Sequence, residues 1–189
     1  MPDTNPVRFT WTHVPNRGPD ESLLRLRPGQ RVLDLGCGRG THLAYLCRAH
    51  QIEGVGIDHD PHLATAACTY LGGGTASFIR DDARAHLDHL AESSVDAIYS
   101  RFGAVWFTDP DELLPLIASR LRPGGRFVFS HLTPGYPASA VPRWELPPQA
   151  WKQHLVALGF RTPHVGVLSC HGRCRYTDCP GVMIGSATR

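Results

Sequence analysis

The residues with the clearest chemical pattern are three glycines at alternate positions, Gly36, Gly38 and Gly40, which directly follow the apolar run 31–35. Glycine permits the sharp turns that bring a backbone close to a ligand, and a helix that starts after such a turn offers free N–H groups. Asp34 precedes the first glycine by two positions. A carboxylate beside the loop suits a ligand with an ammonium group and is unfavourable beside a pyrophosphate. The pattern therefore predicts a site for a ligand that carries a positive charge.

A dinucleotide-binding loop is the main alternative for these glycines. The G-x-G-x-x-G pattern requires glycine at position 41, where this chain has Thr41, and it does not call for an acid inside the preceding strand. Both Thr41 and Asp34 therefore disfavour a nicotinamide-dependent oxidoreductase.

Regular elements alternate along the chain in an order that would position this loop. We expect strands at 31–35, 55–58, 77–80, 95–100, 126–130, 165–168 and 182–185, and helices at 41–50, 61–70, 83–91, 110–121 and 149–158. Strands that alternate with helices indicate a parallel sheet covered on both faces. The last two strands have no helix between them, which predicts an antiparallel hairpin. The expected fold is α/β, a Rossmann-like doubly wound sheet of seven strands, mostly parallel with a C-terminal antiparallel hairpin.

Acidic residues at the ends of the next two expected strands extend the pattern. Asp58 ends the second strand, eighteen residues after Gly40, and Asp81-Asp82-Ala83 follows the third. Together with the acid and the G-x-G-x-G loop, this arrangement resembles the class I S-adenosylmethionine-dependent methyltransferases. The fourth strand with its turn and the glycine turn 121–129 also look like those of the family, so that the likeness covers roughly residues 18–160.

The resemblance implies roles for individual residues. Asp58 would hold both ribose hydroxyls, Asp82 would accept from the adenine amino group, and the Ala83 N–H would face a ring nitrogen. Asp81 stands where the family usually has glycine. The full set of cofactor-binding residues implied is Asp34, Gly36, Cys37, Gly38, Gly40, Asp58, His59, Asp81, Asp82, Ala83, Ser100 and Arg101.

The implied reaction passes a sulfonium methyl group to a nucleophile by in-line displacement, which depends chiefly on holding the two reactants in line. A weak nucleophile also needs a base. We expect the catalytic residues to be His131, directly after the fifth strand, with Tyr99 and Arg101 at the fourth. Histidine is favoured because its ordinary pKa near 6.5 lets it accept a proton around neutrality. His13 is a second candidate base.

The methyl acceptor is expected to be a small or carrier-bound metabolite and not a nucleic acid. The turn 100–103 lacks the Asn/Asp-Pro-Pro-Tyr/Phe sequence of enzymes that methylate exocyclic amino groups. The 19 basic and 17 acidic residues nearly balance, and no run of five basic residues exists. Aromatic residues in the irregular segments would wall a pocket for an apolar acceptor. The expected substrate-binding residues are Trp11, His13, Phe102, Trp106, His131, Tyr136 and Trp144.

Length and composition predict one domain over residues 1–189, because 189 residues with 42% hydrophobic content suit a single core. Its expected parts are an N-terminal cap segment (1–28), a cofactor-binding core (29–133), a short substrate loop (134–148) and a C-terminal helix and hairpin (149–189). No signal peptide or apolar run of eighteen residues is readable, so we expect a cytoplasmic protein without a membrane partner, as a monomer or homodimer.

Three cysteines lie close together near the end of the chain. Cys170, Cys174 and Cys179 are spaced irregularly, whereas zinc sites usually combine two close pairs of ligands. Zinc at these cysteines is possible but not favoured, and a reducing compartment favours free thiols over a disulfide. We therefore expect no metal site.

The predicted function is transfer of a methyl group from S-adenosylmethionine to an O, N or C nucleophile of a metabolite in secondary metabolite biosynthesis, with S-adenosylhomocysteine as the product. The alternative is a regulatory or structural subunit that binds S-adenosylmethionine without catalysis, because its binding motifs would be the same.

Overall fold

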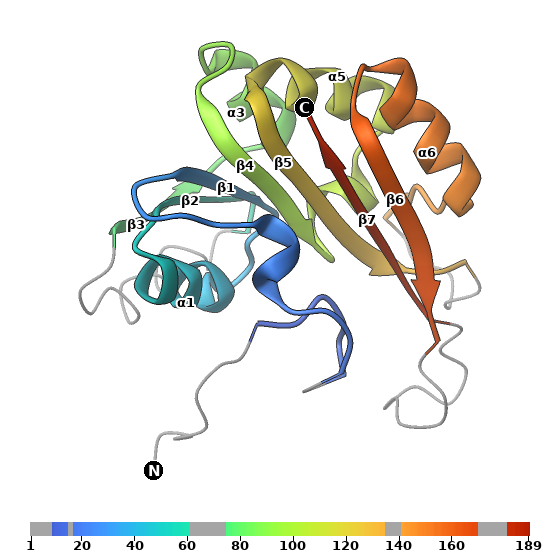
Figure 1. The fold of residues 1–189 in the computed structure, drawn as a ribbon, viewed down its shortest axis with the longest axis horizontal. Helices are drawn as coiled ribbons and strands as arrows, with labels where there is room; N and C mark the ends of the chain where they lie inside the picture. Colours follow the sequence, from blue (N-terminus) through green and yellow to red (C-terminus); the bar gives the residue numbers. More distant parts are fainter. Residues whose placement is uncertain (1–8, 15–16, 61–74, 135–140, 170–180) are drawn as a thin grey trace.

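The structure is a computed structural model that describes residues 9–14, 17–60, 75–134, 141–169 and 181–189. Its centre is a seven-stranded sheet with the order β3-β2-β1-β4-β5-β7-β6 (Figure 1). The strands are β1 (Arg31–Leu35), β2 (Glu53–Asp58), β3 (Thr75–Arg80), β4 (Val95–Arg101), β5 (Leu121–Leu132), β6 (Arg161–Leu168) and β7 (Val182–Thr188). The helices are η1 (Glu21–Leu24, a 3-10 helix), α1 (Thr41–His50), α3 (Ala83–His89), α4 (Ala104–Phe107), α5 (Pro110–Arg120) and α6 (Pro148–Ala157).

The strand directions confirm the expected fold class. Strands β1 to β5 pair in parallel, and β7 pairs antiparallel with both β5 and β6. Three details differ from the expectation. β5 begins at Leu121 and contains the Pro-Gly-Gly turn, and α4 was not expected at all. The segment after Gly18, whose sequence predicts a short helix that ends before Pro28, forms only one 3-10 turn. The helix expected at 61–70 lies outside the described residues.

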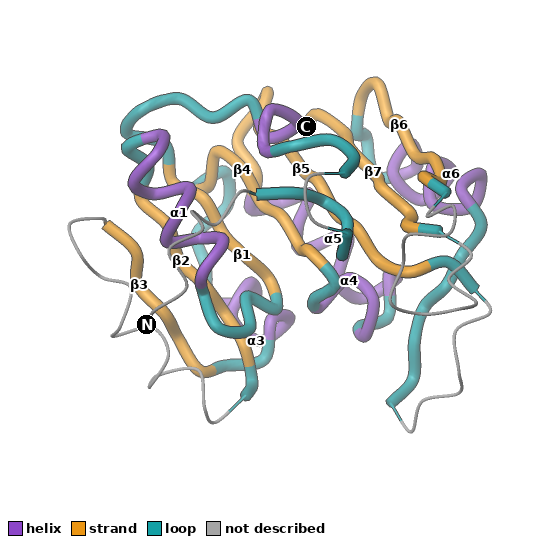
Figure 2. Tube along the Cα trace, turned by 90° about the horizontal axis from the view of Figure 1, so that it is seen from below, coloured by secondary structure: helices purple, strands orange, loops and turns teal. Residues whose placement is uncertain are grey.

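Helices lie on both sides of the sheet, as Figure 2 shows from a second direction. Alternate side chains of each strand point to opposite faces. In β1, Leu33 and Leu35 join the core under α3, α5 and α6, whereas Val32 joins a second core with α1 and the N-terminal residues Phe9 and Trp11. Both faces of the central strands are therefore buried, whereas the outer strands β3 and β6 are largely exposed.

The strand order changes direction between β1 and β4, because the chain winds from β1 outward to β3 and then returns to β4 on the other side. In doubly wound sheets, ligands bind at the carboxyl ends of the strands beside this switch point. The fold therefore directs attention to the ends of β1, β2 and β4. Among the described residues, no helix combines the length and the apolar character needed to cross a membrane.

Candidate functional site

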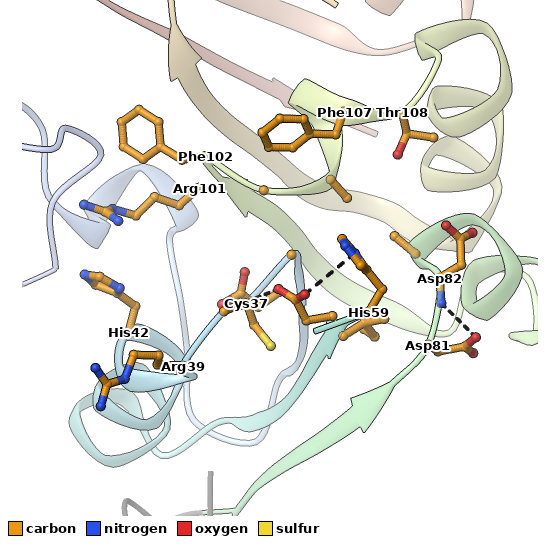
Figure 3. A pocket seen from close by; sticks show the side chains of 18 of the residues that line it. Cys37, Arg39, His42, His59, Asp81, Asp82, Arg101, Phe102, Phe107 and Thr108 are labelled. Carbon is orange, nitrogen blue, oxygen red and sulfur yellow. Dashed lines mark hydrogen bonds and ion pairs between the residues drawn. The ribbon is translucent and has the colours of Figure 1, made fainter. Parts of the chain in front are cut away.

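A cavity of about 550 Å³ lies at the carboxyl ends of β1, β2 and β4 (Figure 3). Its described wall comes from the glycine loop, the start of α1, the ends of β2 and β3, and the turn between β4 and α4. The lining residues are Asp34, Gly36, Cys37, Gly38, Arg39, Thr41, His42, Ile57, Asp58, His59, Asp81, Asp82, Ala83, Arg101, Phe102, Gly103, Ala104, Phe107, Thr108 and Val141.

The glycine loop is shaped by two different constraints. Gly36 has a φ of +82°, and a Cβ atom there would come within 2.6 Å of the backbone nitrogen of Ala104. Gly38 has a φ of +51°, and a Cβ atom there would meet nothing within 4 Å. Gly36 therefore serves the close packing of the loop against the β4–α4 turn, while the space beside Gly38 is open to a ligand.

Asp58 at the end of β2 is fixed by two backbone hydrogen bonds. Its Oδ2 accepts from the Gly38 N–H at 2.8 Å, and its Oδ1 accepts from the Asp60 N–H at 3.0 Å. The carboxylate thus joins the glycine loop to the end of β2 in the wall of the cavity. The neighbouring His59 is 92% exposed at its side chain, with Nδ1 3.8 Å from Asp58 Oδ1.

The two aspartates after β3 have different partners. Oδ1 of Asp82 accepts from the N–H groups of Arg84 and Ala85, both at 3.0 Å, and so caps the start of α3. Oδ1 of Asp81 accepts from the Asp82 N–H at 2.8 Å, and its Oδ2 lies 3.4 Å from His86 Nδ1. Both aspartates line the cavity, at the end away from Arg101 in Figure 3.

Asp34 is the buried acid of the site, with only 3% of its surface exposed. Its Oδ2 accepts a hydrogen bond from the Tyr99 hydroxyl at 2.7 Å. Its Oδ1 is inaccessible to solvent and has no hydrogen-bond partner among the described groups. Burial raises the pKa of Asp34 to about 7, against the opposing effects of the Tyr99 hydrogen bond and the Arg101 charge.

Arg101, the last residue of β4, is a cation whose charge acts on Asp34. Its Nε donates to the Thr10 carbonyl at 2.5 Å and its Nη2 donates to the Thr12 carbonyl at 2.6 Å. Burial lowers its pKa from the ordinary value, but guanidinium stays charged at neutral pH. Arg101 therefore links the N-terminal segment to the end of β4. Figure 3 places Arg101, Arg39 and His42 together on one side of the cavity.

Two phenylalanines form an apolar part of the wall, and the guanidinium carbon of Arg101 lies 5.1 Å from the centre of the Phe102 ring. Phe102 and Phe107 lie on the opposite side of the cavity from Cys37 and His59 in Figure 3. Phe102 has a φ of +53°, an unfavourable conformation for a residue with a Cβ atom, and its N–H donates to the Ser130 carbonyl at 2.8 Å. Phe107, the last residue of helix α4, is 38% exposed.

His131, the favoured base, is not part of the described cavity wall. Its side chain is 0% exposed, and its ring lies 6.0 Å from that of Phe129, 6.1 Å from that of Trp106 and 5.7 Å from that of Trp151. Nδ1 bonds the Leu132 carbonyl at 2.7 Å. Burial lowers its pKa to about 4. The structure thus gives His131 the environment of a core residue, because β7 and two tryptophans enclose it.

Two further expected site residues are also buried away from the cavity. The Tyr99 hydroxyl contacts Asp34 and is not directed to a ligand, and the Ser100 hydroxyl donates to the Leu35 carbonyl at 2.8 Å. Both side chains are 0% exposed. Gly40 lies outside the cavity wall as the N-cap of α1.

The aromatic residues expected to bind substrate are mostly core residues. Trp11 is 0% exposed and Trp106 is 7% exposed. The Trp144 N–H donates to the Trp106 carbonyl at 2.9 Å, which places the substrate loop beside α4. His13 does not line the cavity either, but its ring lies edge-on, at 6.1 Å, to that of Phe102, which does. Tyr136 lies outside the described residues.

Several residues of the cavity wall were not expected individually, among them Arg39, His42, Thr108 and Val141. Arg39 lies between Gly38 and Gly40, and this position beside the alternate glycines could have identified it. His42 lies one residue after Thr41, on the turn of α1 that faces the loop. Val141 lies in the segment 134–148 that was expected to bind substrate, but the pattern could not single it out, because its position depends on how the chain returns from β5.

The three clustered cysteines, Cys170, Cys174 and Cys179, lie outside the described residues. Within the part of the chain that the structure describes, no group of three His, Cys, Asp or Glu side chains could hold a metal ion. Cys37 lines the cavity, and burial raises the pKa of its thiol well above the ordinary range.

Comparisons with known proteins agree with this geometry. Residues 32–125 match a family described as a methyltransferase domain. An O-methyltransferase from Pyrenophora dematioidea is 31% identical over 184 residues, which cover 87% of this chain and 68% of that protein. A phosphoethanolamine N-methyltransferase 1 from Arabidopsis thaliana is 32% identical over 107 residues, 57% of this chain but only 22% of that protein. This chain therefore spans about a fifth of the length of that relative.

Among solved structures, a SAM-dependent methyltransferase from Archaeoglobus fulgidus superposes with a TM-score of 0.71 and 21% identity, covering 89% of this chain and 92% of the other. That likeness establishes the shared fold, and the sequence relationship to the O-methyltransferase establishes the family. The chain belongs to the class I S-adenosylmethionine-dependent methyltransferases.

Proposed function

We propose that this protein binds S-adenosylmethionine in the cavity at the ends of β1, β2 and β4 and transfers its methyl group to a small or carrier-bound metabolite. One observation carries the proposal. Asp34, whose buried Oδ1 has no hydrogen-bond partner among the described groups, and Asp58, whose carboxylate is fixed by backbone N–H groups, both line the cavity. A ligand that carries an ammonium group and a ribose matches this pair of acceptors.

The residues present fit the remaining groups of the cofactor. Arg101 and the N–H groups of the glycine loop would hold the carboxylate of the methionine part. Beyond the ribose, Oδ2 of Asp82 would accept from the adenine amino group, since its Oδ1 caps α3. His59 and Phe107 lie on opposite sides of the cavity at this level (Figure 3), which supports a flat aromatic ring between them.

Bound S-adenosylmethionine would supply an activated methyl group on a positively charged sulfur. The protein would hold that group against the turn after β4, where Phe102 and Gly103 line the cavity. The phenylalanine side chains would exclude water from the reacting atoms. Alignment of the two reactants would then account for most of the rate enhancement.

A base is needed where the acceptor is a weak nucleophile, and we propose His13 for this role in place of His131. His13 lies beside Phe102 on the N-terminal segment that Arg101 holds. Burial and the nearby Arg101 charge lower the pKa of His13 below 6.5, so that it is neutral and able to accept a proton at pH 7.

The acceptor would enter past Phe102, Phe107 and Val141, and this apolar rim supports a substrate with an apolar part. The relatives include an N-methyltransferase of phosphoethanolamine and an O-methyltransferase, so the atom methylated here follows from neither name. The four-part division of one domain, cytoplasmic location, secondary metabolite biosynthesis and a monomeric or homodimeric state stay predictions of the sequence.

The test has two steps. Isothermal titration calorimetry should detect binding of S-adenosylmethionine and S-adenosylhomocysteine and no binding of NAD. A screen with S-adenosylmethionine labelled at the methyl group should then transfer label to members of a metabolite set. Binding of NAD alone would overturn the proposal. Cofactor binding with no transfer across the set, compared with an active methyltransferase on its own substrate, would favour the non-catalytic alternative.

A further inference from the structure

Asp34 is enclosed by the sheet and yet reaches the cavity. It lies in β1 between Gly56 of β2 and Tyr99 of β4 in the strand register. Tyr99 binds Oδ2, which leaves Oδ1 as the oxygen without a partner in the described wall. A buried polar oxygen without a partner costs about 1 to 3 kcal/mol, so its retention at a cavity wall points to a ligand group that completes it.

The surroundings of Asp34 do little to stabilise a negative charge. Described groups that act on it electrostatically are Tyr99 and Arg101 from β4, Asp58 from β2, Cys37 from the loop and Cys47 from α1. Arg101 is the one cation in this set, and two of its N–H groups bind the Thr10 and Thr12 carbonyls. Asp58 adds a second negative charge. His42 on α1 is neutral at pH 7, because burial lowers its pKa to about 4.

An isolated carboxylate in such a place is unstable relative to the protonated acid. The pKa of about 7 agrees with this argument from burial and partners. In the protein without ligand, a proton therefore occupies Asp34 in a large share of molecules at neutral pH.

We propose that cofactor binding expels this proton: Asp34 gives up its proton to solvent as the ammonium group of the ligand arrives, and Tyr99 holds Oδ2 so that Oδ1 receives the ammonium. This inference rests on the proposed function and assigns Tyr99 as a positioning residue. The O–H bond of the acid breaks, the proton passes to buffer, and an N–H···O hydrogen bond replaces it. The ion pair that forms carries no net charge, as the acid did before.

The exchange makes the amino-acid end of the ligand the source of pH dependence. Below pH 7, Asp34 must lose its proton before it binds the ammonium, so affinity falls as the pH falls, by up to about tenfold per pH unit. Between pH 7 and 8 the affinity levels off. An adenosine ligand without the amino-acid part should show no such fall in affinity at acidic pH.

Calorimetry on the whole protein tests the proposal with two ligands. S-adenosylhomocysteine, titrated at pH 7 in phosphate and in Tris, should release about half a proton per ligand bound, and its affinity at pH 6 should be about tenfold weaker than at pH 8. 5′-Methylthioadenosine, which lacks the ammonium and the carboxylate, should bind without proton release and with constant affinity. Equal enthalpies for S-adenosylhomocysteine in the two buffers would overturn the proposal.

Variants assign the effect to the two residues. Asp34→Asn should remove proton release and the fall in S-adenosylhomocysteine affinity at acidic pH, while leaving the affinity for methylthioadenosine unchanged. Tyr99→Phe removes the hydrogen bond that favours the charged acid. The affinity for S-adenosylhomocysteine should therefore begin to fall at a higher pH. Asp58→Asn is the control: it should weaken both ligands and retain the fall in affinity at acidic pH, moved to lower pH because a charge that raises the pKa of Asp34 is lost.

Retention of the slope in a folded Asp34→Asn variant would overturn the inference and leave the proposed function intact. Failure of both ligands to bind the unmodified protein at any pH would overturn the proposed function and the inference together.

Discussion

The carboxyl ends of β1, β2 and β4 open onto the cavity, whereas the carboxyl end of β5 is closed. Asp34, Asp58 and Arg101 stand at the open ends and line the wall. His131 stands at the closed end with no exposed surface. β5 pairs with β7 from Arg126 to Leu132, and two tryptophan rings lie near the imidazole. A polar residue at a strand end is therefore available for chemistry only where no later element covers that end.

The two regions also neutralise their ionisable groups with different consequences. Burial favours the neutral form of both Asp34 and His131. Asp34 keeps one oxygen at the cavity wall, so a ligand can reverse the effect. His131 stacks between aromatic rings, so a charge on it opposes the folded state. The same physical cause thus prepares a binding group in one region and a stability constraint in the other.

The largest effect is expected at the glycine loop of the open region. Gly36→Ala should lower the free energy of unfolding by roughly 4 kcal/mol or more, because a strained φ adds to a collision with the β4–α4 backbone. Thermal and urea denaturation measure this. Gly29→Ala is the control, since Gly29 has a φ of +77° and open space around it, and it should cost only about 1 to 2 kcal/mol. Equal losses in the two variants would show that Gly36 is not packed closely.

The closed region predicts a pH effect on stability. The pKa of His131 is about 4 in the folded state and near 6.5 in the unfolded chain, so the unfolded state binds more protons between these values. Its contribution to stability is present above pH 6.5 and is lost as the pH falls toward 4, by about 3 kcal/mol in total. His131→Phe should reduce the destabilisation at acidic pH that urea titrations measure. The destabilisation that remains in this variant includes the contribution of His42, whose pKa is also lowered by burial. A turnover that vanishes in a stable His131→Phe variant would restore the catalytic assignment.

The next effect concerns ligand binding in the open region. Asp58→Ala should weaken S-adenosylhomocysteine binding by about 2 kcal/mol, roughly 30-fold, because the ribose hydroxyls lose their charged acceptor. Calorimetry at pH 8 measures it. Asp88→Ala removes the same charge from the exposed face of α3 and should leave the affinity unchanged. An unaltered affinity in Asp58→Ala would contradict the ribose assignment.

The smallest effect is expected at the apolar wall. Phe107→Ala should weaken cofactor binding by about 1 kcal/mol, or about fivefold, with little change in stability, because the ring is 38% exposed and faces the cavity. Val156→Ala provides the comparison, since Val156 is 59% exposed on α6 and is absent from the cavity wall. It should alter neither property. If Phe107→Ala instead destabilised the fold without changing affinity, Phe107 would belong to the core.

Local sequence determined much of the fold and the cofactor side of the site. The glycines after β1 mark a turn that other residues cannot adopt easily, and the alternation of strands and helices predicts the parallel sheet. Asp58 and Asp82 were predictable because Asp58 ends β2 and Asp82 lies two residues after the end of β3. Helix α4 was not, since its four residues follow a strand without a clear start signal.

Tertiary structure alone decided which of these side chains reach the cavity. Arg101 binds carbonyls about ninety residues earlier in the chain, and Trp151 packs against His131 from about twenty residues later. Such contacts depend on packing between distant segments, which local periodicity does not record. The sequence by itself therefore determined the loop, the strand ends and the family. The long-range packing decided that Asp34 keeps an unpaired oxygen at the cavity while His131 is enclosed.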